Sequence, residues 1–227
     1  MFCITLAEST YKKLLEKIEK GSKYTDFFEL RVDYLRDLNT SELEKLLKLP
    51  YKFLFTFRSY EEGGYKKFSD GFRLEWILWA LNQKFYLVDL EWKLFKKFYS
   101  KLKNLNFNKI LISYHNFKKT PSLKYLNRLL IEMQKRGVKK AKIVCMCKTL
   151  EESFRLLNLI FFAKKRKIEL ISFGMGEKGK ISRIFSLFCG APFTYVVLSK
   201  KETVAPGQFD INSAIKFYET IKQIIVS

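Results

Sequence analysis

The sequence has one histidine and four cysteines among 227 residues, and acidic residues are scarce relative to basic ones. The cysteines lie in apolar segments without CxxC spacing, and Cys145 and Cys147 would project to the same side of a strand. We therefore expect neither a disulfide nor a metal site. No apolar run approaches the roughly 20 residues that a membrane span needs, and residues 1–8 lack the basic-then-apolar order of a signal peptide. These absences predict a cytoplasmic protein with no membrane partner.

The shortage of acidic residues leaves a large positive charge. Only 23 acidic residues oppose 43 basic ones, which gives a formal net charge of +20. Such an excess raises the hypothesis of a nucleic-acid or other polyanionic partner. The basic residues are spread along the chain, however, and no RRM, helix-turn-helix or zinc-finger signature accompanies them. We favour a lysine-rich solvated surface over a specific nucleic-acid site, and a field that steers an anionic small substrate fits both interpretations.

Apolar runs alternate with amphipathic, charged segments along the whole chain. The apolar runs predict eight strands: Phe2–Leu6, Phe27–Val32, Lys52–Phe57, Phe85–Leu90, Lys109–Tyr114, Lys142–Met146, Ile168–Phe173 and Thr194–Leu198. The amphipathic segments predict eight helices: Tyr11–Lys20, Ser41–Lys48, Gly71–Leu81, Leu94–Leu102, Ser122–Arg136, Leu150–Lys165, Ile181–Phe188 and Ile211–Ile225. Strands that are apolar on both faces and joined by helices are typical of parallel sheets. Eight such units without a linker or a Gly-rich nucleotide turn predict one domain over residues 1–227, a single (β/α)8 TIM barrel.

Charged residues interrupt the second predicted strand. Glu29, Arg31 and Asp33 alternate and therefore share one face of that strand. Since the outer face of a barrel strand packs against helices, the charged set should point into the barrel, where charges are costly unless they are paired or used. Two interpretations stay open: an internal salt-bridge network, or a polar site for a hydroxylated ligand.

The lone histidine and one lysine lie in neighbouring predicted strands. His115 ends the apolar run that begins at Lys109, and Lys142 is flanked by Ala141 and Ile143 inside the next run. Burial lowers the pKa of a lysine, and its neutral amine can attack a carbonyl to form a Schiff base. A proton-transfer group facing an amine nucleophile predicts an active site.

Other polar residues follow the ends of predicted strands, where the active site of a barrel lies. Arg58 ends strand three beside a flexible Glu61-Glu-Gly-Gly64 loop, and Glu91 follows strand four. Arg183 lies near the start of the helix after strand seven and offers a bidentate fork to a carboxylate or phosphate. Gln208 closes an Ala-Pro-Gly-Gln stretch that is either a ligand-binding lid or a plain surface turn.

Together these segments resemble the type I 3-dehydroquinate dehydratases over essentially the whole chain. The matching segments, in chain order, are Glu29-Leu-Arg31-Val-Asp33, Thr56-Phe-Arg58, Ser113-Tyr-His115-Asn-Phe117 with Thr120-Pro121, Lys142-Ile143, Met175 through Gly179-Lys-Ile-Ser-Arg183, and Ala205-Pro-Gly-Gln208. The resemblance implies a lyase that dehydrates 3-dehydroquinate to 3-dehydroshikimate in the shikimate route to aromatic amino acids. It further implies catalysis through a covalent imine without metal or cofactor, and a homodimer.

The resemblance also implies roles for individual residues. Lys142 would condense with the C3 ketone, and His115 would move the C2 proton to the departing C1 hydroxyl. We expect Glu91 to orient His115 and set its tautomer. Arg183 would hold the substrate carboxylate. The remaining expected binding residues are polar contacts from Glu29, Arg31, Arg58 and Gln208, and apolar walls from Phe117, Met175 and Tyr195.

The chain departs from the family pattern in three places. Asn116 stands where the family commonly has Asp, and Val204 stands where it usually has a small hydroxyl residue, with Thr203 one position away. Bacterial relatives often carry an N-terminal hairpin that covers the bottom of the barrel, whereas this sequence begins almost directly with strand one. We expect another closure for that end, and a monofunctional chain.

Two other functions remain as alternatives. Another Schiff-base barrel, such as a class I aldolase, would use Lys142 equally well but would normally have a phosphate cradle after strands seven and eight. A basic barrel that binds nucleic acid would instead keep His115 and Lys142 as core residues, and its binding would depend strongly on salt.

Overall fold

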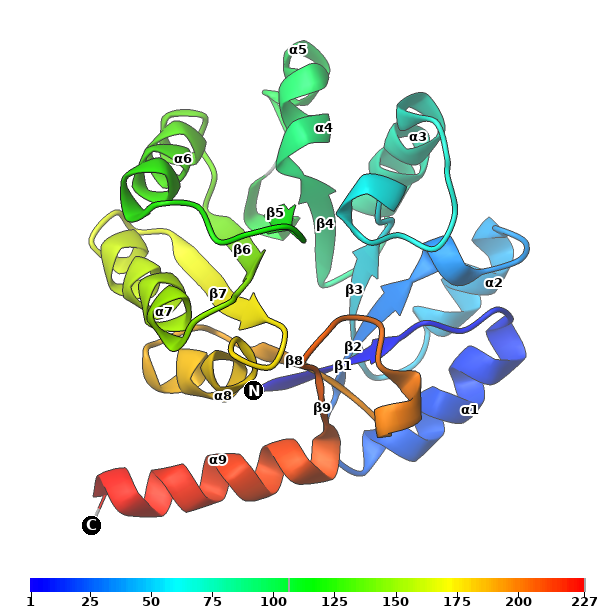
Figure 1. Ribbon diagram of the computed structural model, residues 1–227. Helices are drawn as coiled ribbons and strands as arrows, with labels where there is room; N and C mark the ends of the chain where they lie inside the picture. Colours follow the sequence, from blue (N-terminus) through cyan, green and yellow to red (C-terminus); the bar gives the residue numbers. More distant parts are fainter. Residues whose placement is uncertain (106, 227) are drawn as a thin grey trace.

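The computed structural model describes residues 1–105 and 107–226, and its main feature is a curled sheet of parallel strands with helices on the outside (Figure 1). The strands are β1 (Phe2–Leu6), β2 (Phe27–Arg31), β3 (Lys52–Thr56), β4 (Leu87–Glu91), β5 (Ile110–Asn116), β6 (Lys140–Met146), β7 (Glu169–Met175), β8 (Thr194–Val197) and β9 (Phe209–Asp210). Their order in the sheet is β7-β6-β5-β4-β3-β2-β1-β8-β9. The predicted (β/α)8 barrel is confirmed, with β9 as a short unpredicted addition that pairs with β8.

The helices lie between the strands in sequence, as the amphipathic segments predict. They are α1 (Tyr11–Ser22), α2 (Thr40–Leu46), α3 (Asp70–Leu81), α4 (Trp92–Lys97), α5 (Tyr99–Leu102), α6 (Leu123–Lys135), α7 (Leu150–Lys164), α8 (Lys180–Phe188) and α9 (Ile211–Val226). Four 3-10 turns occur within the described residues: η1 (Val32–Tyr34), η2 (Tyr60–Glu62), η3 (Phe107–Lys109) and η4 (Lys200–Glu202). The predicted helix over residues 94–102 is two helices, because Phe98 leaves the helical region at φ −112° and ψ 26°. Over the described residues, every helix is too short or too polar to cross a membrane.

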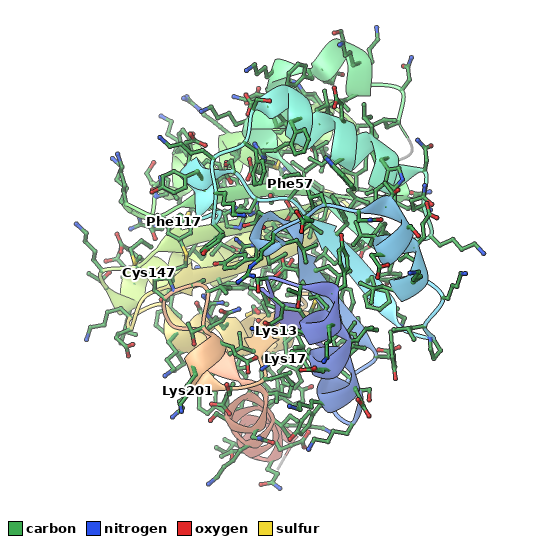
Figure 2. The ribbon with its side chains drawn as sticks, turned by 90° about the vertical axis from the view of Figure 1, so that its right-hand side faces the viewer. Lys13, Lys17, Phe57, Phe117, Cys147 and Lys201 are labelled. Carbon is green, nitrogen blue, oxygen red and sulfur yellow. The ribbon has the colours of Figure 1, made fainter. Side chains whose placement is uncertain are left out.

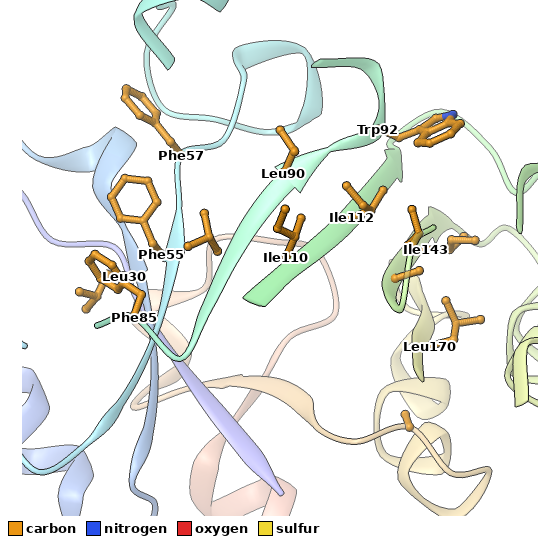
Figure 3. Close-up of a cluster of buried hydrophobic side chains, with 14 of the residues drawn as sticks. Leu30, Phe55, Phe57, Phe85, Leu90, Trp92, Ile110, Ile112, Ile143 and Leu170 are labelled. Carbon is orange, nitrogen blue, oxygen red and sulfur yellow. The ribbon is translucent and has the colours of Figure 1, made fainter. Parts of the chain in front are cut away.

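Most of the hydrophobic core lies between the sheet and the helices. Figure 3 shows side chains of this layer, among them Leu30, Phe55, Ile112 and Ile143, which come from strands β2, β3, β5 and β6. They pack with helical residues that recur on one face of each helix, such as Leu126 and Leu130 of α6. The strands therefore bury their outward side chains in apolar surroundings, and the polar residues of the same strands point into the barrel.

Aromatic side chains fill the barrel at the amino-terminal ends of the strands. The ring of Phe27 lies 5.4 Å from that of Tyr86 and 4.9 Å from that of Phe193, centroid to centroid. These rings belong to or border an inner cluster with Cys3, Leu54, Leu87, Leu111 and Ile171. The described residues contain only parallel strand pairs and no hairpin. In place of the hairpin that covers this end in many relatives, the side chains of the inner cluster fill it.

Side chains also close the seam between β7 and β8, which share no ladder within the described residues. The rings of Phe173 on β7 and Tyr195 on β8 face each other at 6.2 Å between centroids. Helix α8 and the segment between β8 and β9 both contribute residues to the hollow described below.

Loss of the Phe27 ring should weaken the fold, because a buried phenyl group would leave a cavity at the bottom of the barrel. We expect Phe27→Ala to lower the free energy of unfolding by about 3–5 kcal/mol, measured by urea denaturation. Phe154→Ala is the matched control: Phe154 is 58% exposed on α7, and its loss should change stability by less than about 0.5 kcal/mol. Equal effects at the two positions would contradict the assignment of Phe27 to the closing cluster.

Candidate active site

A hollow with about 470 Å³ of empty space, part of it open to solvent, lies at the carboxyl ends of the strands. Every site residue predicted from the sequence borders it except Glu91. The residues that line the hollow are Thr5, Glu29, Arg31, Arg58, Glu62, Gly63, His115, Phe117, Lys142, Val144, Phe173, Met175, Arg183, Tyr195, Val204, Ala205 and Gln208. Parallel strands place their carboxyl ends at one edge, so residues far apart in the sequence meet there.

Lys142 projects from β6 into this hollow and is 6% exposed. Its Nζ lies 3.8 Å from the centroid of the Tyr195 ring and 4.0 Å from Oε1 of Glu29. Burial lowers the pKa of Lys142 to about 8, although the Glu29 carboxylate opposes that shift. The amine is therefore neutral in a larger fraction of molecules near neutral pH than an exposed lysine, and a neutral amine is the nucleophilic form.

Hydroxyl groups hold the Glu29 carboxylate in place. Thr5 donates to Oε2 at 2.8 Å and Thr56 donates to Oε1 at 2.9 Å. Asp33, on the same strand face in the sequence, instead accepts two hydrogen bonds of 2.8 Å from Arg31. Arg31 and Asp33 thus form the buried ion pair of the first interpretation. Glu29 and Arg31 also border the hollow, and their binding of a hydroxylated ligand stays a prediction.

His115 contacts Glu62 rather than the predicted Glu91. The distance from His115 Nδ1 to Glu62 Oε2 is 2.9 Å, and the backbone N–H of His115 donates to the same oxygen at 3.1 Å. In the sequence, Glu62 is only one residue of the flexible Glu61-Glu-Gly-Gly64 loop. The missed signal is its position four residues after the strand-end Arg58, where the 3-10 turn η2 folds it back over the barrel.

The surroundings of the His115–Glu62 pair shift both groups toward their neutral forms. Burial raises the pKa of Glu62, the Glu91 carboxylate raises it further, and Arg58 lowers it. Burial also lowers the pKa of His115, and the cations Arg58 and Lys142 act in the same direction. The imidazole is therefore uncharged near neutral pH and able to accept a proton, provided that Nδ1 carries its hydrogen.

The prediction that Glu91 orients His115 is wrong, because both of its carboxylate oxygens are engaged elsewhere. Oε1 accepts the backbone N–H of Ser59 at 2.8 Å and a hydrogen bond from Arg58 at 3.3 Å. Oε2 accepts a hydrogen bond of 2.6 Å from Arg73 of α3. Glu91 is the last residue of β4, and its side chain is not among those that line the hollow.

Carboxylates and a hydroxyl around Arg58 pair with its positive charge. It donates to Asp89 Oδ2 at 2.8 Å and to the Ser113 hydroxyl at 2.9 Å, and Ser113 donates to the other Asp89 oxygen at 2.7 Å. These acidic neighbours, Asp89 and Glu91 foremost, hold the pKa of Arg58 above its usual range against the opposing effect of burial. Arg58 is therefore a permanent positive charge at the wall of the hollow.

Arg183 differs because no carboxylate among the described residues pairs with it. The side chain is 2% exposed, and its Nη2 donates to the Pro206 carbonyl at 3.0 Å. Its guanidinium carbon lies 4.6 Å from the centroid of the Phe173 ring, and Nε has no hydrogen-bond partner within the described chain. Burial lowers the pKa of Arg183 to about 9. A buried guanidinium that borders the hollow and has no acidic partner among the described residues is suited to binding an anionic group.

The segment between β8 and β9 covers one side of the hollow. Its turn needs Gly207, which has φ +77° and whose Cα lies so close to Gly176 that a Cβ would meet the Gly176 carbonyl at 2.7 Å. Gln208 Nε2 donates to the Thr5 hydroxyl at 3.4 Å, and its Oε1 accepts the Val204 N–H at 3.1 Å. The interpretation of this stretch as a plain surface turn is therefore wrong, because Val204, Ala205 and Gln208 border the hollow.

An ion pair ties the beginning of this segment to helix α1. Figure 2 shows Lys17 of α1 beside the segment that carries Lys201, and the Lys17 amine contacts the Glu202 carboxylate of η4. Ser199 donates to the same carboxylate oxygen at 3.0 Å. The segment is thus fixed at both ends, by Glu202 at its start and by Gln208 at its end.

The departures from the family pattern have separate structural outcomes. Thr203 donates to the Lys200 carbonyl at 2.8 Å, so its hydroxyl does not replace one at Val204, whose apolar side chain borders the hollow. Asn116 Oδ1 accepts the backbone N–H groups of Lys118 and Lys119 at 3.0 and 3.1 Å. A carboxylate oxygen would accept the same two bonds, so Asn116 preserves the turn that follows His115.

Apolar side chains complete the wall, as the sequence predicts for Phe117, Met175 and Tyr195. Phe117 packs against Gly63, where φ is +87° and a Cβ would meet the phenyl ring at 2.4 Å. The Tyr195 hydroxyl is buried without a hydrogen-bond partner in the described chain, and burial raises its pKa well above the usual value. These side chains give the hollow an apolar side next to the Lys142 amine.

Comparison with known proteins gives a consistent match over the whole chain. The family model for type I 3-dehydroquinase matches residues 2–225. A 3-dehydroquinate dehydratase of Pyrococcus abyssi is 38% identical over 218 residues, which cover 93% of this chain and 94% of that protein. A protein of the same name from Methanocaldococcus jannaschii is 33% identical over 218 residues, which cover 94% of this chain and 95% of that protein.

Solved structures show the same architecture. The 3-dehydroquinate dehydratase of Geobacillus kaustophilus superimposes with a TM-score of 0.86 at 24% identity, covering 98% of this chain and 91% of that one. The structure from Aquifex aeolicus gives a TM-score of 0.75 at 27% identity, covering 97% and 98%. On the family match and the curated relatives, the chain belongs to the type I 3-dehydroquinase family.

Proposed function

We propose that this protein dehydrates 3-dehydroquinate to 3-dehydroshikimate through an imine on Lys142, and so serves the shikimate route to aromatic amino acids. The observation that supports this most directly is the content of one hollow: a buried amine of lowered pKa, a histidine held by a carboxylate, and an arginine without an acidic partner. Family membership supplies the reaction to which this arrangement corresponds.

The first half of the reaction activates the substrate. The neutral Lys142 amine adds to the C3 ketone, the adduct loses water, and the nitrogen takes up one proton, which the final hydrolysis returns, to give an iminium with a C3–N double bond. This cation acidifies the neighbouring C2 proton, because the electrons of the breaking C–H bond can move into the C3–N bond. His115 accepts that proton at Nε2 and becomes an imidazolium.

The second half expels water and releases the product. The enamine electrons form the C1–C2 double bond as the C1 hydroxyl departs, and His115 returns its proton to that hydroxyl, so that water leaves. Hydrolysis of the remaining imine frees 3-dehydroshikimate and regenerates the Lys142 amine. The protein needs no net proton and no electron from outside, and we propose that no cofactor takes part.

Glu62 sets the tautomer of His115 in this mechanism. Its carboxylate accepts Nδ1–H, which leaves the Nε2 lone pair free to take the C2 proton, and it stabilises the imidazolium that forms. The pair is competent when Glu62 is ionised and Lys142 is neutral. Because burial raises the pKa of Glu62 and lowers that of Lys142 to about 8, activity should increase with pH through the neutral range.

The remaining residues hold the substrate. Arg183 binds its carboxylate, since this guanidinium is the buried cation without a carboxylate partner among the described residues. Glu29, Arg31, Arg58 and Gln208 bind the hydroxyl groups, while Phe117, Met175 and Tyr195 limit access of water. Val204 contributes an apolar contact, so the carboxylate receives no hydroxyl hydrogen bond from that position.

The aldolase alternative lacks the support that the dehydratase has. It would normally have a phosphate cradle after strands seven and eight, where this chain has the single Arg183 and a segment held by Gln208. We further propose a cytoplasmic enzyme in which residues 1–227 act as one catalytic domain. Homodimer formation and the lack of a specific nucleic-acid partner stay predictions, and the net charge of +20 would steer the anionic substrate.

Trapping of the imine tests the proposed function. Borohydride added during turnover of 3-dehydroquinate should reduce the imine and attach the ligand to Lys142, located by mass spectrometry of the digested protein. His115→Ala should retain trapping but lose at least about 10²-fold in turnover, followed by absorbance of the conjugated enone product. Lys140→Met, on the same strand, should behave as wild type. A wild-type protein that neither turns over nor traps 3-dehydroquinate would refute the proposal.

Replacement of Glu62 by glutamine should impair catalysis, because the negative charge beside His115 is lost. A glutamine amide is neutral, so it holds Nδ1–H less strongly than the carboxylate does and stabilises the imidazolium less. We expect Glu62→Gln to lower kcat roughly 10²- to 10⁴-fold, measured with saturating substrate. Glu61→Gln, at the neighbouring exposed position, should leave kcat unchanged, and a similar loss in both variants would argue against the assigned role.

Removal of the Lys142 charge should stabilise the fold. Burial lowers the pKa of Lys142 from 10.5 to about 8, so the unfolded chain binds this proton more tightly than the folded one. The wild type therefore gains stability as pH rises from 8 to 10.5, and Lys142→Met lacks that gain. At pH 7 the variant should exceed wild type by about 2 kcal/mol in the free energy of unfolding, measured in urea. Lower stability of Lys142→Met at pH 7 would contradict this expectation.

A further inference from the structure

Arg73 is a buried charge outside the hollow. It lies in the first turns of α3, on the outside of the barrel, and is 1% exposed. Its guanidinium donates to Glu91 Oε2 at 2.6 Å and, through Nη2 and Nε, to the Phe57 carbonyl at 3.2 and 3.3 Å. A further donor reaches Asp70 at 3.4 Å. Arg73 thus ties helix α3 to the ends of β3 and β4.

The opposite oxygen of Glu91 holds the turn that carries Glu62. It accepts the Ser59 backbone N–H at 2.8 Å and a hydrogen bond from Arg58 at 3.3 Å. Ser59 in turn accepts the Glu62 backbone N–H on its hydroxyl at 3.3 Å. A continuous series of hydrogen bonds therefore connects Arg73, through Glu91 and Ser59, to the backbone of Glu62, the residue whose carboxylate contacts His115.

A gain in stability is a weak explanation for the buried Arg73–Glu91 ion pair. The desolvation of two buried charges offsets much of their attraction, and an apolar pair of similar volume often stabilises a fold as well or better. A charged pair does give direction, because each donor and acceptor fixes the position of its partner. The contacts of Glu91 are directed at the turn on which the position of Glu62 depends.

We infer that Arg73 and Glu91 are positioning residues for catalysis: they fix the turn from Ser59 to Glu62 so that the Glu62 carboxylate meets His115. Neither touches the hollow, so they act on substrate only through Ser59, Arg58 and Glu62. The inference rests on the proposed dehydratase function and assigns to Glu91 a role one step removed from the imidazole.

The charge of Glu91 supplies a signature that a purely structural role would lack. Glu62 is faced by Arg58, Asp89, Glu91 and His115, and after burial the Glu91 carboxylate is the main cause that raises the pKa of Glu62. Loss of that charge favours the ionised form of Glu62. The rise of activity with pH should then begin at lower pH, even where the absolute rate is reduced.

Glu91→Gln tests the inference, because glutamine retains an acceptor for Ser59 but loses the charge. We expect kcat to fall about tenfold or more, KM to change less than kcat, and the rise of the pH–kcat profile to move to lower pH. Borohydride trapping at Lys142 should remain. Lys97→Met is the matched control, since Lys97 of α4 forms an exposed ion pair with Asp70 of α3, and it should leave kcat and the pH profile unchanged.

Two further variants separate positioning from loss of folding. Arg73→Met combined with Glu91→Gln removes both buried charges, so the fold keeps no unpaired charge, and the fall in kcat and the shift in pH should persist. Arg73→Lys keeps the ion pair with Glu91 and should recover much of the activity that Arg73→Met loses. Thermal unfolding monitors the fold of each variant.

The outcomes distinguish this inference from the proposed function. Wild-type kcat and an unshifted pH profile in the folded double variant would overturn the positioning role while leaving the dehydratase assignment intact. Absence of turnover and trapping in the wild type would instead refute the dehydratase assignment itself. Loss of trapping in the folded Glu91→Gln variant would place Glu91 in imine formation and would also overturn the inference.

Discussion

The carboxyl end of the barrel depends on the pairing of charges that the fold has removed from water. Arg58 is surrounded by Asp89, Glu91 and the Ser113 hydroxyl, and Glu29 is held by two threonine hydroxyls. Each pairing offsets a desolvation cost that an isolated buried charge could not overcome. The charges that remain less than fully paired, at Lys142 and Arg183, are those on which the proposed chemistry depends.

One end of the barrel stabilises the fold, and the other end holds the candidate active site. At the amino-terminal ends of the strands, rings such as Phe27 and Phe193 pack together and supply stability without polar atoms to satisfy. At the carboxyl ends, the same strands carry charged groups in a setting where low polarity strengthens their mutual effects. One set of strands therefore provides both a rigid apolar base and a preorganised polar site.

Connections between elements are as important here as the strands. The η2 turn brings Glu62 to His115, and the segment after β8 brings Gln208 to Thr5 and the Pro206 carbonyl to Arg183. Both connections are fixed by contacts outside the hollow, one through Glu91 and Arg73, the other through Glu202 and Lys17. The geometry of the site is thus set by residues that substrate does not reach.

The sequence by itself determined the barrel, the inward position of the charged strand residues and the meeting of His115 with Lys142. Periodicity carries this information, because alternating faces and crossover helices leave few ways to bury the apolar runs. The sequence could not identify the carboxylate that contacts His115. Glu62 and Glu91 both follow strand ends, and their separation in sequence from His115 is uninformative. Only the tertiary structure decided between them. The η2 turn directs Glu62 toward His115, and the buried Arg73 binds the Glu91 carboxylate; both contacts exist only in the packed chain.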